Sequence, residues 1–304
     1  MKKIVIAGGT GYLGQVLVRY FKSLGYECVI LTRKQQRSQE KVRFVQWDAK
    51  SLGDWVNELE NAEALINLNG KSVNCRYTAQ NRLDIFNSRQ LSTFVLGEAI
   101  LQCKTPPQVW LNSASATIYR HAQDRPMDEF DGEIGEGFSV EVCKLWEHTF
   151  FGFNLPKTRK IILRSALVLG NDGGVFPEFK KLVQTGIGGK MGSGKQMVSW
   201  IHEKDFANSV HFLIKNSVCS GVFNLSAPIP LSNNDMMDFL RRKLNIRFGL
   251  PSTLWMLKLG TWIKQTEAEL VLKSRWVIPT RLKSFGFDFE FNEFEKAVDN
   301  LLKT

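Results

Sequence analysis

A glycine-rich turn near the start of the chain constrains its fold more than any other feature. Glycines stand at positions 8, 11 and 14, directly after an apolar run at 4–7. Apolar residues then recur at helical spacing until Gly25, where a left-handed C-terminal cap would end a helix. A second apolar run follows at 28–31. A strand, a glycine turn, a helix and a strand in this order predict a βαβ unit.

In such a unit each glycine has its own steric role. The first permits the tight turn, the second lets the backbone approach a pyrophosphate, and the third lets the helix pack closely on the strand. Free N–H groups at the start of the helix then bind the phosphates. The alternative is a glycine-rich loop without a ligand. We predict a dinucleotide site whose contacts come from Gly8, Thr10, Gly11, Tyr12, Leu13 and Gly14.

Length and composition are those of an ordinary globular protein. The 304 residues allow one large domain or two modest ones, and 43% of them are hydrophobic and 23% charged. Lys2 and Lys3 lead into a short strand and not into a long apolar signal region, so we expect a cytoplasmic protein. The five cysteines are odd in number and widely scattered, which predicts reduced thiols.

The net charge of +10 raises the question of a nucleic-acid partner. The basic residues are dispersed, the longest run is 241–243, and no recognition motif accompanies them. We therefore predict no nucleic-acid binding, and a basic surface that attracts an anionic cofactor or substrate.

Neither a membrane anchor nor a metal site is predicted. The apolar stretch 254–263 is too short to cross a bilayer and is interrupted by Lys258, so an amphipathic helix over a pocket or partner is expected there. The four histidines lack the spacing of metal ligands.

Apolar runs continue to alternate with helical segments through the first half of the chain. Strands are expected at 42–45, 64–68, 109–111 and 161–163, with a long helix from Leu83 to Ala99. This alternation predicts an α/β fold with a doubly wound parallel sheet of the Rossmann type. Residues 1–170 form the dinucleotide-binding domain in this prediction, and 198–226 return to it. Residues 171–197 and 227–304 form a smaller, mainly helical domain that covers the substrate.

The residues after the second predicted strand favour one cofactor. The end of this strand meets the adenosine ribose, where an acidic residue normally binds the 2′-hydroxyl of NAD. Here the chain has Arg33 and Lys34, without a carboxylate. A planar guanidinium can bind a 2′-phosphate, and Lys34 or Arg37 can add charge, so the sequence predicts NADP(H). The alternative is that Arg33 is a surface cation.

Asp48 follows the third predicted strand. Its carboxylate could accept a hydrogen bond from the adenine amino group, so Asp48 is a candidate cofactor contact. It could equally cap the turn that follows it.

Further motifs lie along the whole chain. They are Asn67–Gly70, Ser113–Tyr119, Leu163–Ala166, Gly192–Gln196, Trp200–Asp205 and Val277–Leu282. Together with the glycine spacing they resemble the short-chain dehydrogenase/reductase superfamily, in particular its extended, nucleotide-sugar epimerase-like branch. The segments 192–196 and 277–282 look like a subgroup of that branch whose substrate is unassigned. Related proteins often pair helices of the sheet domain, so the resemblance allows a homodimer.

The resemblance implies additional site residues. Further cofactor contacts are implied for Leu68, Asn69, Gly70, Lys144, Ser165 and Ala166. Contacts with the substrate are implied for Ser115 and His202.

The family's catalytic set is incomplete in this chain. In the family a tyrosine four residues before a lysine exchanges a proton with the substrate, and a serine lies about two dozen residues upstream. Ser115 and Lys144 occupy the serine and lysine positions, but the tyrosine position holds Val140. No tyrosine follows Tyr119 in the chain. An enzyme on this frame needs another acid or base.

Five side chains are candidates for that role. Tyr119 and Lys144 lead, followed by Glu141, Cys143 and His202. Tyr119 could instead be a packing residue, and Lys144 could bind only the nicotinamide ribose. Ser115 could hydrogen-bond a substrate oxygen or only its neighbouring backbone.

Two functions fit these observations. The first is an NADP(H)-dependent oxidoreductase or epimerase-like enzyme that acts on a small carbonyl, hydroxyl or nucleotide-sugar-like compound, with Ser115, Lys144 and Tyr119 as catalytic candidates. The second is a non-catalytic NADPH-binding protein that senses redox state and passes it to a protein partner. Val140 in the tyrosine position motivates the second.

Overall fold

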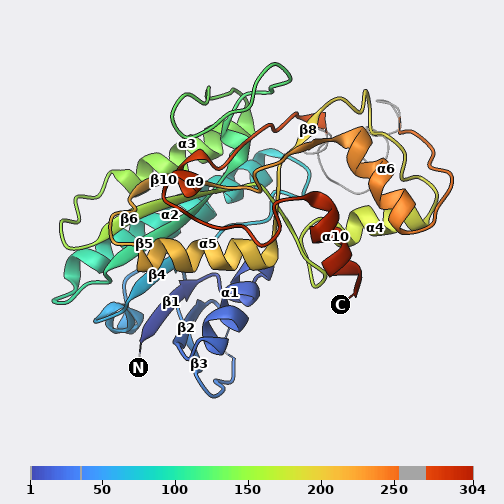
Figure 1. Ribbon diagram of the computed structural model, residues 1–304. Helices are drawn as coiled ribbons and strands as arrows, with labels where there is room; N and C mark the ends of the chain where they lie inside the picture. Colours follow the sequence, from blue (N-terminus) through green and yellow to red (C-terminus); the bar gives the residue numbers. More distant parts are fainter. Residues whose placement is uncertain (1, 35, 253–271, 304) are drawn as a thin grey trace.

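A parallel sheet of seven strands forms the centre of the molecule (Figure 1). The computed structural model describes residues 2–34, 36–252 and 272–303. The strand order is β10-β6-β5-β4-β1-β2-β3. The strands are β1 (Lys3–Ala7), β2 (Glu27–Thr32), β3 (Val42–Gln46), β4 (Ala64–Asn67), β5 (Val109–Ser115), β6 (Arg159–Ser165) and β10 (Gly221–Leu225). All six strands predicted above are present, β10 joins them as the seventh, and the Rossmann-type sheet is confirmed.

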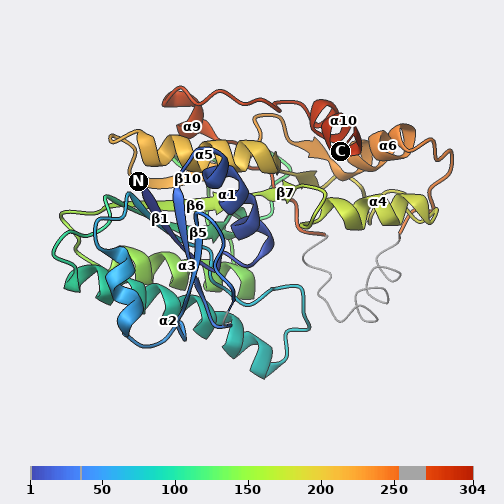
Figure 2. The ribbon, with the colours of Figure 1, turned by 90° about the horizontal axis from the view of Figure 1, so that it is seen from below.

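Helices cover both faces of the sheet (Figure 2). On one face lie α1 (Tyr12–Ser23) and α5 (Glu203–Lys215), and on the other lie α2 (Ala79–Gln102) and α3 (Phe138–Phe151). Successive side chains of a strand point to opposite faces. Ile4 and Ile6 accordingly pack under α1 and α5, while Val5 packs under α2 and α3. Continuous apolar runs are therefore needed at these strands.

The strand order reverses between β1 and β4. The chain moves from β1 outward to β3, then crosses back to β4 and continues outward to β10 on the other side. In open parallel sheets such a reversal opens a crevice at the carboxyl ends of the strands, and ligands bind there. This edge is therefore where the predicted site residues have to meet.

A second, smaller core lies beyond this edge, at the right of Figure 1. Its helices are α4 (Phe176–Gln184), α6 (Asn233–Lys243) and α10 (Phe294–Lys303). Two small sheets join it, one of β7 (Leu167–Leu169) and β9 (Trp200–His202), the other of β8 (Met197–Val198) and β11 (Leu231–Ser232). This core centres on Trp200, Met237 and Phe294.

One segment that the sequence predicts for the smaller domain packs against the sheet domain. The short helix α9 (Thr280–Ser284) lies beside β10, and Leu282 and Phe287 belong to the core under α1 and α5. The chain thus returns to the sheet domain once more before α10. The helix expected at 254–263 lies outside the described residues. Among the helices that the structure describes, none is long and apolar enough to cross a membrane.

Candidate cofactor and substrate site

The glycine turn shows a different steric environment at each glycine. Gly8 has a φ of +81°, and a Cβ on it would lie 3.0 Å from the backbone nitrogen of Asn69. A Cβ on Gly14 would lie 2.5 Å from the Cα of Gly9, which no real Cβ tolerates. At Gly11 the nearest atom would be 3.6 Å away, an ordinary contact. The fold itself therefore requires the first and third glycines, whereas Gly11 is free of such crowding.

The start of α1 has no side-chain cap from its N-cap residue. Its N-cap is Gly11, which offers no side-chain hydrogen bond, and its first turn contains no acidic residue. By contrast, Thr78 caps α2 and Ser232 caps α6 through their hydroxyl groups. The first N–H groups of a helix lack intrahelical partners and carry partial positive charge. This helix start can thus accept the phosphates of a ligand.

The side chain of Tyr12 fastens a neighbouring loop to α1. Its hydroxyl donates to Glu203 Oε2 at 2.9 Å, and its ring lies against Gly173 and Gly174. Burial and the nearby Glu203 carboxylate raise the pKa of Tyr12. Arg19 adds an ion pair of 3.0 Å with Asp172 in the same loop. The tyrosine ring therefore serves the fold, and a cofactor contact of Tyr12, predicted above, would come from its backbone.

Arg33 and Lys34 lie exposed at the carboxyl end of β2. Neither side chain has an ion pair or hydrogen bond with any residue that the structure describes. Asp48 is engaged: its carboxylate accepts the backbone N–H groups of Lys50 and Ser51, each at 2.8 Å. These bonds lower the pKa of Asp48 to about 2. The turn-capping role of Asp48 is thus present, and its adenine contact stays a prediction.

A buried amide network fixes the loop after β4. Asn67 Nδ2 donates to Asn112 Oδ1 at 2.7 Å and to Thr93 Oγ1 at 3.1 Å. Asn67 Oδ1 accepts the backbone N–H of Asn69 at 3.0 Å. Because Asn69 also lies against Gly8, this network holds the predicted contacts Leu68, Asn69 and Gly70 beside the glycine turn.

Two serines stand side by side where β5 and β6 end. Ser115 and Ser165 are register partners, and Ser115 Oγ accepts the backbone N–H of Thr117 at 3.2 Å. The Oγ of Ser165 is buried and has no hydrogen-bond partner among the described residues. The next residue, Ala166, donates its backbone N–H to Leu225. A buried hydroxyl without a partner costs free energy, so Ser165 marks a place for a ligand atom.

The position of the family's tyrosine is closed by apolar packing. Val140 is fully buried and belongs to a cluster with Ile118, Tyr119, Met127 and Val277. Three separate segments of the chain thus meet at this side chain. Val140 therefore has no contact with solvent from which a substrate could approach it.

Tyr119 is sealed in the same cluster. Its side chain is 2% exposed, its hydroxyl donates to Asn224 Oδ1 at 3.0 Å, and the hydroxyl accepts from Arg164 Nη1 at 2.8 Å. Arg164 in turn binds Glu147 through two hydrogen bonds of 2.8 Å. Burial raises the pKa of Tyr119 despite the adjacent guanidinium. This placement supports the packing role of Tyr119, the plainer alternative.

Lys144 and Glu141 are the accessible members of the candidate set. Lys144 Nζ pairs with Glu141 Oε1 at 2.8 Å, and about half of each side chain is exposed. Lys144 lines a cavity of about 630 Å³ together with Glu136, His148 and Arg164. Ser115 is not among the residues that line this cavity.

Cys143 and His202 are both buried. Burial raises the pKa of the Cys143 thiol to about 12. His202 is 1% exposed, stacks on Phe291 at 3.9 Å, and accepts the backbone N–H of Lys204 at the start of α5. Burial lowers the pKa of His202 to about 4. The structure thus gives His202 a capping role, and its expected substrate contact stays a prediction.

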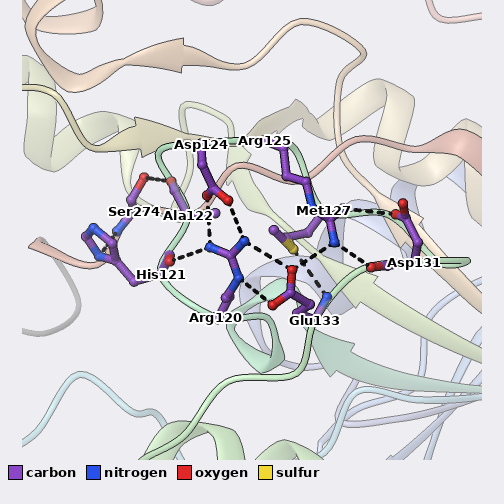
Figure 3. A network of polar contacts seen from close by, with 9 residues as sticks. All are labelled: Arg120, His121, Ala122, Asp124, Arg125, Met127, Asp131, Glu133 and Ser274. Atoms are coloured by element: carbon purple, nitrogen blue, oxygen red, sulfur yellow. Dashed lines mark hydrogen bonds and ion pairs between the residues drawn. The ribbon is translucent and has the colours of Figure 1, made fainter.

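An ion network stiffens the loop that borders the cavity (Figure 3). The guanidinium of Arg120 lies between two carboxylates and binds both Asp124 and Glu133. Arg125 also binds Glu133, at 2.8 Å. These two guanidinium groups lower the pKa of Glu133. The residues just after Glu133 form a wall shared by this cavity and a second one of about 640 Å³.

Sequence inspection missed Glu147, the partner of Arg164. Both side chains are 11% exposed. The available signal was Arg164 itself, a charged residue directly after the buried run Ile161–Leu163. A charge that continues an apolar strand requires a buried partner.

Comparisons with known proteins agree with this geometry. The model of the NAD-dependent epimerase/dehydratase family matches residues 4–146, and a domain of unknown function matches 254–301. An epimerase family protein of Staphylococcus aureus is 33% identical over the full length of both chains.

Solved structures resemble the whole fold. The human epimerase family protein SDR39U1, solved with NADPH, superposes with a TM-score of 0.88 at 25% identity and covers 99% of both chains. A nucleoside-diphosphate sugar epimerase from Corynebacterium glutamicum gives a TM-score of 0.79 at 26% identity, over 99% of this chain and 58% of that one.

Proposed function

Because this chain belongs to the NAD-dependent epimerase/dehydratase family, we propose that it binds NADP(H) and interconverts hydroxyl and carbonyl groups on a small molecule. The substrate class is a small carbonyl, hydroxyl or nucleotide-sugar-like compound. The observation that carries the choice of cofactor is Arg33, an exposed guanidinium without a partner among the described residues, at the strand end that meets the adenosine ribose.

The residues present fit such a cofactor. The uncapped start of α1 offers N–H groups for the pyrophosphate, and Arg33 with Lys34 offers positive charge for a 2′-phosphate. The unpartnered Ser165 hydroxyl lies at the same edge of the sheet. The NADPH in the human relative supports the same cofactor.

The bound nicotinamide would supply hydride exchange, and the chain's own groups would supply the proton. Tyr119 and Cys143 are sealed, and His202 is a buried cap, which leaves the paired Lys144 and Glu141 as the accessible acid and base. An ammonium and a carboxylate 2.8 Å apart can pass a proton between them and on to a substrate oxygen.

A non-catalytic NADPH sensor is the second candidate. Val140 and Tyr119 are both buried and closed to substrate. The position of the family's proton donor therefore holds an apolar residue and is also packed into the core. A sensor needs only the cofactor cradle, that is, the glycine turn, the start of α1 and Arg33, and it needs no proton donor. It predicts a protein partner whose affinity differs between the NADP and NADPH forms, and no turnover on carbonyl or nucleotide-sugar compounds.

The variant Arg33→Asp tests the cofactor assignment. We expect it to weaken NADPH binding by about 100-fold and to change NADH binding by less than about threefold, since only NADPH carries the 2′-phosphate. Fluorescence titration with both cofactors measures this. Lys157→Asp, which makes the same charge change before β6 at the opposite edge of the sheet, is the control and should alter neither. Equal losses for both cofactors in Arg33→Asp would show that Arg33 does not meet the 2′-phosphate.

A further inference from the structure

We propose that Arg89 forms a binding site for an anionic oxygen group, a carboxylate or a phosphate, on a molecule bound at the carboxyl edge of β4. Nothing in the sequence motifs singled out this residue. The inference rests on the proposed function, because it takes that edge to be where cofactor and substrate bind.

Arg89 reaches from α2 to the predicted cofactor loop. Its Nη1 donates to the backbone oxygens of Lys71 and Ile85, each at 3.1 Å. A Cβ on Gly70 would lie 3.1 Å from the Cζ of Arg89, so the guanidinium rests directly on that glycine. The indole of Trp146 from α3 lies 5.0 Å from Cζ. The guanidinium is thus held in place by three elements before any ligand arrives.

No carboxylate of a described residue neutralises this guanidinium. Among the described residues, none forms an ion pair with Arg89, and burial lowers its pKa. Arg164, another arginine packed beside α3, shows the usual solution: its Nε and Nη2 bind the two carboxylate oxygens of Glu147. A desolvated charge without such a partner is costly to keep.

The same pair of donors, Nε and Nη2, is free in Arg89. Neither forms a hydrogen bond with any residue that the structure describes. They are not sealed either, since the fully buried side-chain atoms without partners in the described chain are Trp110 Nε1, Ser165 Oγ and His202 Nε2. An Nε–Nη2 edge that is not fully buried matches the two oxygens of a carboxylate or phosphate.

The position of this edge limits where the anion comes from. Gly70 follows Asn69, and Asn69 lies against Gly8 of the glycine turn. An anion on Arg89 therefore belongs either to a phosphate of the dinucleotide or to a second molecule, the substrate. The chemistry recognised is the same in both cases.

Thermal unfolding with simple anions tests the site. The probes are inorganic phosphate and malonate at about 50 mM, compared with NaCl at equal ionic strength, on the protein alone and on the protein saturated with NADPH. We expect each probe to raise the Tm of the natural chain by a few degrees over NaCl. In Arg89→Met this rise should disappear, while its Tm in NaCl stays equal or increases, because an uncompensated charge has been removed.

Arg164→Met is the matched control. It should lower the Tm by roughly 10 °C, because it leaves Glu147 buried and unpaired, and should keep the response to the anions. Arg89→Lys keeps the charge and loses the planar fork, so it should lose most of the response to the anions. This variant provides the test if Arg89→Met does not fold. An anion response that survives in both Arg89 variants would overturn the proposal.

The NADPH arm identifies the source of the anion. A response that persists in NADPH-saturated protein, with NADPH affinity in Arg89→Met within about threefold of the natural chain, assigns the anion to a substrate. A response that NADPH abolishes, with at least about tenfold weaker NADPH binding in the variant, assigns it to the cofactor. Failure of the natural chain to bind NADPH would remove the proposed function and would leave the anion response at Arg89 as a separate result.

Discussion

The two halves of the expected site differ in how their polar groups are satisfied. One half is the glycine turn with the start of α1. The other is the first turn of α3 with the segments packed on it. Around the glycine turn, the N-cap residue of α1 gives no side-chain hydrogen bond to the helix, and Arg33 has no partner among the described residues. Around α3, the hydroxyl of Tyr119 has two partners and Val140 is enclosed by apolar side chains.

This difference separates binding from chemistry. A surface that leaves donors unpaired is prepared for a ligand, because the ligand supplies the missing partners. A cluster in which every polar group is paired and the other side chains are apolar stabilises the fold and offers no group to a ligand. The groups around the glycine turn are therefore open to a ligand, whereas the tyrosine position is packed into the core, so any proton donor must lie elsewhere.

The largest effect is expected from the glycine that the fold itself requires. Gly14→Ala should lower the free energy of unfolding by about 3–4 kcal/mol, because its Cβ would press on the backbone of Gly9. Gly11→Ala is the matched substitution: it should change stability by less than about 1 kcal/mol and weaken NADPH binding by about tenfold. Urea unfolding and NADPH titration of both variants measure this. Similar stability losses in the two variants would erase the steric distinction between them.

The next effect is the pH dependence of stability, which we trace to two buried side chains that contact the segment before α10. His202 stacks on Phe291, and Asp205 accepts the backbone N–H groups of Glu290 and Phe291. Burial lowers the pKa of His202 to about 4 and raises the pKa of Asp205 to about 6. We expect substitutions of these two residues to change stability alone.

The two pKa shifts make the free energy of unfolding change with pH in opposite directions. As pH falls from 6.5 to 4, the unfolded chain takes up a proton at His202 that the folded protein refuses, which destabilises the fold by roughly 3 kcal/mol. As pH falls from 6 to 3.8, the folded protein takes up a proton at Asp205 before the unfolded chain does, which stabilises it by a similar amount.

Single variants separate these contributions. Compared with the natural chain, His202→Asn, which can still cap α5, should become relatively more stable as pH falls through this window, and Asp205→Asn relatively less stable. Urea unfolding at several pH values, with NADPH affinity measured alongside at neutral pH, provides the test. A loss of NADPH affinity in His202→Asn at unchanged stability would return His202 to the binding site.

The smallest stability effect is expected at the tyrosine position. Val140→Tyr should cost about 1–3 kcal/mol of unfolding free energy and add no turnover, because the larger ring does not fit the cluster of Ile118, Met127 and Val277. Val140→Phe, of similar size without a hydroxyl, separates the cost of volume from that of the polar group. A stable Val140→Tyr variant that gains turnover would show that the position opens toward the substrate.

Local patterns predicted most of the fold and the cradle. The apolar runs and Gly25 located β1, α1 and β2 because burial and turn conformation act on neighbouring residues. They could not show that 280–287 packs back on the sheet, or that Tyr119 is sealed by Arg164, since both depend on residues far apart in the chain. Arg89 carried no signal, because a cation within a helix looks the same whether it faces solvent or a site.

The most direct test of the account is the affinity of the unmodified protein for NADPH and for NADH. The eight tryptophans allow both dissociation constants to be measured by fluorescence in one buffer. The intact cradle with Arg33 at its end predicts that NADPH binds at least about tenfold more tightly than NADH. Equal affinities, or no binding of either cofactor, would contradict it.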